Sequence, residues 1–71
     1  MKTINWKRTM QNLRDALMNA KIPQNVFADR IGISPQQLSN YLNGWSVPSA
    51  DTFARMQDEI AFQIVWGFGK K

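Results

Sequence analysis

A helix stop and a helix start lie only three residues apart at Gly32 and Pro35, and this pair constrains the fold more than any other feature. Gly32 suits the end of a helix, because glycine adopts positive φ without steric cost. Ser34 suits an N-cap, and Pro35 suits the first helical position. Gln37, at the third position, completes a capping box with Ser34. The sequence therefore predicts two helices joined by a tight turn.

Two further helices are predicted around this pair. The first covers about residues 5–20, because apolar residues recur at intervals of three and four. Its stripe consists of Met10, Leu13, Leu17 and Ala20. The helix before the turn is predicted over about 23–30, with Pro23 in its first turn, and the helix after it over 35–43, closed by Asn43-Gly44. Ser49 is expected to cap a fourth helix.

The C-terminal segment alternates between large apolar residues and other residues from Ile60 to Phe68. Alternation with aromatic and β-branched content favours a strand. A helix is the alternative, because Ile60, Ile64 and Phe68 are also spaced by four. A strand must pair, either with the same strand of a second subunit or with Thr3–Trp6. We favour a dimerisation segment over residues 60–71, with completion of the monomer core as the alternative. The dimerisation candidates are Phe62, Ile64, Trp66 and Phe68.

Residues 24–42 resemble the helix-turn-helix of the phage repressor and Cro superfamily. Gln24 opens the second helix, Ala28 is the small residue at the helix crossing, and Gly32 makes the turn. The matching apolar positions are Phe27, Ile31, Ile33, Leu38 and Tyr41. The resemblance covers about residues 8–60. It implies a mostly α, four- to five-helix, lambda-repressor-like domain, to which we add the possible C-terminal β-strand. A single domain over 1–71 is expected, with a core of about residues 6–59.

The resemblance implies that helix 35–43 enters the major groove of DNA. Its candidate base-contacting residues are Gln36, Gln37, Asn40, Pro35 and Ser39. Glutamine and asparagine can each form bidentate hydrogen bonds with adenine, and Pro35 can pack on a thymine methyl group. For Gln37, capping and base reading are both open. Gln36 and Asn40 lie one turn apart on one face and are the leading candidates.

Other polar residues near the ends of these two helices are candidates for phosphate contact. They are Gln24, Asn25, Ser34, Asn43, Trp45 and Ser46. Packing at a dimer interface is the alternative for Trp45. Lys7, Arg8 and Arg14 could contact phosphate, but for each of them we favour a place on the solvated side of the first helix. The formal net charge is +4, which suits a polyanion, but residues 31–50 carry no charged side chain, so recognition there must use neutral groups.

The chain contains no cysteine and no histidine, which excludes thiolate and imidazole chemistry. Asp58 and Glu59 are adjacent and point apart on a helix, so no catalytic carboxylate pair is expected. We therefore predict a protein that is not an enzyme, without cofactor, metal or small-molecule ligand. No signal peptide or apolar span is evident, so no membrane contact and a cytoplasmic location are expected.

The resemblance implies a bacterial or phage-encoded transcriptional repressor. Its expected partner is double-stranded DNA, read as a palindromic operator by a homodimer. Repression would follow from exclusion of the polymerase. The alternative is a protein-interaction module with the same fold, such as the antitoxin of a toxin–antitoxin pair, in which the aromatic C-terminal segment binds a partner protein.

Overall fold

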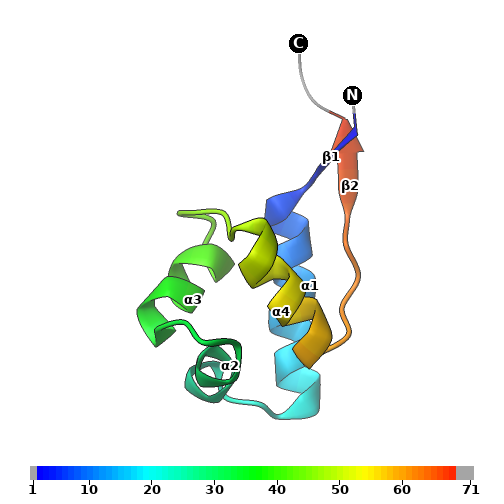
Figure 1. Cartoon of the computed structure of the whole chain (residues 1–71). Coiled ribbons are helices and arrows are strands. Elements are labelled where there is room, and N and C mark those ends of the chain that lie inside the picture. Colours follow the sequence, from blue (N-terminus) through cyan, green and yellow to red (C-terminus); the bar gives the residue numbers. More distant parts are fainter. Residues whose placement is uncertain (1, 69–71) are drawn as a thin grey trace.

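The computed structural model describes residues 2–68, and this part of the chain forms four helices and a two-stranded antiparallel ribbon (Figure 1). The mostly helical fold class predicted from the sequence is confirmed. In chain order the elements are β1 (Lys2–Ile4), α1 (Trp6–Ala20), α2 (Gln24–Ile31), α3 (Pro35–Leu42), α4 (Ala50–Glu59) and β2 (Trp66–Phe68).

The turn between α2 and α3 has the predicted chemistry. Gly32 lies in the left-handed region with φ 79°, and the Ile33 N–H donates to the Ala28 carbonyl at 3.0 Å. The Gln37 N–H donates to Ser34 Oγ at 3.1 Å, and the Ser34 N–H donates to Gln37 Oε1 at 3.3 Å. Both halves of the predicted capping box are therefore present, and they fix the residue at which α3 begins.

The other helix ends differ from the predictions in detail. Pro23 is the N-cap of α2, one position before its first helical residue, with ψ 148°. At the end of α3, only Gly44 has positive φ, whereas Asn43 has φ −89°. Lys21 ends α1 in the left-handed region with φ 59°, although glycine or asparagine is usual there. Ser49 caps α4 as predicted and accepts from the Thr52 N–H.

All four helices contribute side chains to one buried core. Met10, Leu13 and Leu17 of α1 belong to it, but Ala20, the fourth residue of the predicted stripe, is exposed. Ala20 is the last residue of α1, and the chain turns away there. The remaining buried apolar residues are Phe27, Ala28, Ile31, Leu38, Leu42, Phe53 and Met56.

The C-terminal segment pairs within its own chain, which is one of the two pairings that the sequence left open. Ile4 lies opposite Trp66 in the β1–β2 ribbon. The predicted strand from residue 60 is wrong for residues 60–65, which form no strand. This stretch lies along α1, as Figure 1 shows, and bonds to side chains of that helix. The Val65 carbonyl also accepts from the backbone N–H of Asn5, the residue between β1 and α1, at 2.8 Å. The Val65 N–H donates to Thr9 Oγ1 at 3.0 Å, and Asn12 Nδ2 donates to the Gln63 carbonyl at 2.9 Å.

Residues 60–65 also extend the core beyond α4. Ile60, Phe62 and Ile64 are partly buried and pack against the buried residues. The ring of Phe53 meets Phe62 edge-on at 5.9 Å and Trp6 edge-on at 4.9 Å. The segment that the sequence suggested as a separate dimerisation arm therefore closes the core of the monomer over this part of its length.

Ala28 offers a direct test of the packing between α2 and α3. Its side chain is fully buried, so the Ala28→Leu substitution is expected to overpack the core and to lower the free energy of unfolding by about 1–3 kcal/mol. Ala54→Leu makes the same chemical change on the exposed side of α4 and is expected to have little effect. Urea denaturation of both variants measures the difference. Equal stability of the two variants would contradict the position assigned to Ala28.

Candidate nucleic-acid interface

The exposed face of α3 carries two amide side chains that are bonded to each other. Gln36 is exposed, Asn40 is half-buried, and Gln36 Nε2 donates to Asn40 Oδ1 at 3.1 Å. The bond uses the nitrogen of one amide and the oxygen of the other. Gln36 Oε1 and Asn40 Nδ2 therefore present an acceptor and a donor side by side. Pro35 is exposed at the first helical position, next to this pair.

The predicted residue Gln37 has its side-chain oxygen engaged in the capping box with Ser34. Of the two interpretations that the sequence left open, the capping contact is therefore the one present in the structure. Ser34 is itself exposed, and its hydroxyl oxygen accepts from the Gln37 N–H. Both residues contribute to the geometry of the start of α3.

A chain of hydrogen bonds connects the other end of α3 to α1. Asn43 Nδ2 donates to Ser39 Oγ at 3.2 Å, and Arg14 Nη2 donates to Asn43 Oδ1 at 3.2 Å. Ser39 and Asn43 are thus oriented by a guanidinium from a helix outside the helix-turn-helix. Sequence reasoning missed this contact, because residues 14 and 43 are distant in the chain and their types do not indicate a pair.

The start of α2 has backbone donors that its own N-cap does not satisfy. Pro23 makes no side-chain capping bond, and Gln24 and Asn25, the first two helical residues, are exposed. The N–H groups of a first helical turn have no partner within the helix, and together with the helix dipole they favour an anion. This end of α2 is chemically suited to a phosphate.

The loop after α3 presents Trp45 and Ser46 to solvent. The side chain of Trp45 is exposed, and the residue as a whole is 79% exposed. Its backbone N–H donates to the Asn40 carbonyl at 2.9 Å. Indole groups this exposed are uncommon on a monomer surface. The exposure is compatible with both interpretations of Trp45, as a phosphate contact and as part of a dimer interface.

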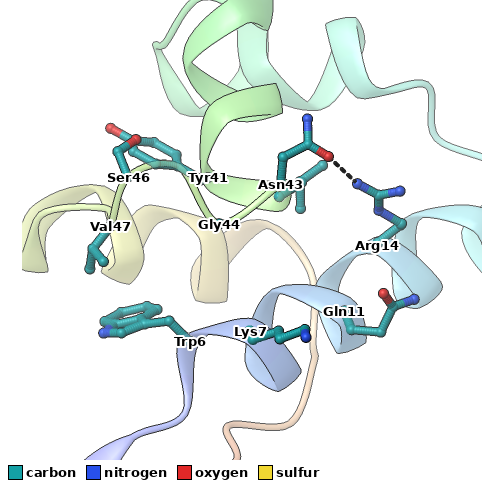
Figure 2. A pocket seen from close by; sticks show the side chains of 10 residues that line it. Trp6, Lys7, Gln11, Arg14, Tyr41, Asn43, Gly44, Ser46 and Val47 are labelled. Atoms are coloured by element: carbon teal, nitrogen blue, oxygen red, sulfur yellow. Dashed lines mark hydrogen bonds between the residues drawn. The ribbon is translucent and has the colours of Figure 1, made fainter.

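A cleft of about 550 Å³ separates this loop from the first half of α1 (Figure 2). Lys7 and Arg14 line it from α1, and the Arg14–Asn43 hydrogen bond crosses one end. Trp6 and Val47 lie at the other end. This cleft could not be predicted from the sequence, because α1 and the α3–α4 loop are brought together only by packing.

The predicted dimerisation residues fall into three groups. Phe62 and Ile64 pack against the monomer core, so their side chains have a role within the monomer. Trp66 is 51% exposed on β2. The side chain of Phe68 lies outside the described part of the structure. Within residues 2–68, no helix is long and apolar enough to cross a membrane.

The fold and the polar face of α3 together define a helix-turn-helix protein. Comparison with protein families supports this: the family model described as Helix-turn-helix (HTH_3) matches residues 13–63. The chain belongs to this helix-turn-helix family, a family of DNA-binding regulators that typically lack enzymatic activity. The match agrees with the resemblance to phage repressor and Cro proteins. Neither the comparison with curated proteins nor that with solved structures finds a match.

Proposed function

We propose that this protein is a sequence-specific transcriptional repressor that binds a palindromic operator as a homodimer, with α3 in the major groove. The observation that carries the proposal is the bonded pair of Gln36 and Asn40 on the exposed face of α3. Its position follows from the Gly32 turn and the Ser34 cap, which orient α3. Repression would result from occupation of a promoter, which excludes the polymerase.

The Gln36–Asn40 pair matches the major-groove edge of adenine. Adenine presents an acceptor at N7 and a donor at N6. Asn40 Nδ2 can donate to N7 while Gln36 Oε1 accepts from N6, and the bond between the two amides is kept. Because each side chain holds the other in place, little rotamer entropy is lost on binding. The two residues would then read one adenine as a unit.

Alanine substitutions at Gln36 and Asn40 test this reading. Each is expected to weaken binding to the preferred site by about 1–3 kcal/mol and to relax preference at one base pair of each half-site. The double variant is expected to lose less binding free energy than the two single variants lose together, because either substitution already breaks the Gln36–Asn40 pair. These losses are measured by titration of two kinds of duplex. Selected DNA contains the site that the unmodified protein prefers, obtained by selection from random sequences, and random DNA lacks that site.

Gln57→Ala supplies the matched control, because Gln57 is an exposed glutamine on α4, away from α3. It is expected to bind selected DNA as the unmodified protein does. If the Gln36 and Asn40 variants lose the same affinity for selected DNA as for random DNA, these residues do not read bases.

The β1–β2 ribbon is the contact that we propose for the homodimer. A ribbon of two strands is only marginally stable in water, so a further strand or packing surface would stabilise it. Its two strands are three residues long, and Trp66 contributes a large apolar side chain that is 51% exposed. Ribbons from two copies would bury this surface and fix the separation of their recognition helices.

A further inference from the structure

We propose that the cleft between α1 and the α3–α4 loop binds a backbone phosphate of the DNA, which extends the interface beyond the helix-turn-helix. The inference rests on the proposed function and names a contact within it. It assigns phosphate contact to Lys7 and Arg14, for which the sequence alone favoured a solvated position.

Three polar residues of α1 form a stripe along one wall of the cleft. Lys7, Gln11 and Arg14 are spaced by four and three residues, so they share one face of the helix. In Figure 2 they lie in a row opposite the loop that follows α3. Polar groups of Asn43 and Ser46 line the facing wall. The cleft thus combines two cationic groups with neutral hydrogen-bonding groups.

The charge in this cleft is not neutralised by carboxylates. Among residues 2–68, the ion pairs join Arg30 to Glu59 and Arg55 to Asp51, so neither cation of the cleft has an acidic partner there. Arg14 donates to the neutral amide of Asn43, and no acidic residue is among those that line the cleft. An anion would therefore meet two cations without first displacing a carboxylate.

Asp15 is the acidic residue closest in sequence to this stripe. Its carboxylate accepts from Gln11 Nε2 at 3.1 Å and does not line the cleft. A second cleft of about 380 Å³, between α2 and the start of α3, has the opposite character, because Asp29 is among its lining residues. Of these two clefts, the one beside α1 is the one whose charge suits a phosphate.

The cleft lies where the DNA backbone would follow the end of the recognition helix. Asn43 belongs both to the cleft and to the hydrogen-bonded chain that includes Ser39 of α3. Residues 31–50 carry no charge, so α3 and its loop provide none of the cationic groups that dominate affinity for DNA. The guanidinium of Arg14, fixed 3.2 Å from Asn43 Oδ1, brings positive charge to the edge of this neutral surface.

The salt dependence of DNA affinity tests the proposal in the full chain. Each phosphate contact contributes about 0.9 to the slope of log K against log salt concentration on duplex DNA. Lys7→Gln and Arg14→Gln are each expected to reduce the slope, and the double variant is expected to reduce it by about 0.9 in total, because both cations contact the same phosphate. Affinity should decline by the same factor on selected and random DNA.

Arg8→Gln is the charge-matched control, because Arg8 is exposed on α1, adjacent in sequence to Lys7, and does not line the cleft. Its slope should equal that of the unmodified protein, and thermal melting should show that all variants fold. Unchanged slopes for Lys7→Gln and Arg14→Gln would overturn the proposal, as would an equal reduction by Arg8→Gln. If the unmodified protein does not prefer selected DNA over random DNA, the proposed function itself fails.

Discussion

A chain that ends at Glu59 is expected to lose its cooperative thermal transition. Ile60, Phe62 and Ile64 pack against the core, and removing three partly buried apolar side chains should cost about 3–5 kcal/mol in total. The truncation also removes the bonding partner of the buried Thr9 hydroxyl and all of β2, so β1 loses its pairing. A domain of this size has a free energy of unfolding of only roughly 4–10 kcal/mol. Circular dichroism during heating measures the effect.

Two single substitutions control for the truncation. Phe62→Ala removes the ring that meets Phe53 and should reproduce a large part of the loss, whereas Gln63→Ala changes an exposed side chain and should melt like the full chain. The bond from Asn12 to the Gln63 carbonyl is retained in that variant. A truncated protein that melts like the full chain but sediments as a monomer would instead assign residues 60–71 to dimerisation alone.

Five base pairs inserted between the operator half-sites are expected to reduce affinity by on the order of 100-fold or more. A rigid two-fold dimer requires half-sites about one helical turn apart, roughly 34–36 Å from centre to centre. The insertion rotates one half-site to the far side of the duplex, so one copy of α3 loses its base contacts. Each lost base-pair contact costs about 1–3 kcal/mol. Titration of both duplexes at one stated salt concentration measures the change.

The control duplex keeps the original spacing and replaces the central bases with the inserted sequence. This duplex is expected to bind like the operator, because only the spacing matters for the dimer geometry. Undiminished affinity after insertion would contradict a rigid dimer. Trp66→Ala extends the test to the proposed interface: it should shift the protein toward monomer in sedimentation while binding to a single half-site is retained.

Local chemistry made the helix-turn-helix predictable. The stop at Gly32 and the capping box of Ser34 and Gln37 depend on backbone conformation within a few residues, so the sequence specifies them directly. The exposed position of Gln36 follows once α3 is known to begin at Pro35. The bond between Gln36 and Asn40 connects residues four apart on one helix, which also lies within the range of local geometry.

The C-terminal segment shows where sequence pattern alone was insufficient. Alternation from Ile60 to Phe68 predicts a strand but cannot identify what covers its apolar face. In the structure, Thr9 and Asn12 of α1 bond to the backbone of residues 63–65 and hold Phe62 against the core. These contacts join groups more than fifty residues apart in the chain, so no local pattern reports them.

By itself, the sequence determined the order of the helices, the turn before α3 and the polar residues that α3 presents, because each depends on neighbours in the chain. Only the tertiary structure decided that β2 pairs with β1 and that Arg14 contacts Asn43 beside the cleft. Both depend on how α1 lies against elements distant in sequence, and that arrangement is set by side chains from all four helices filling one core.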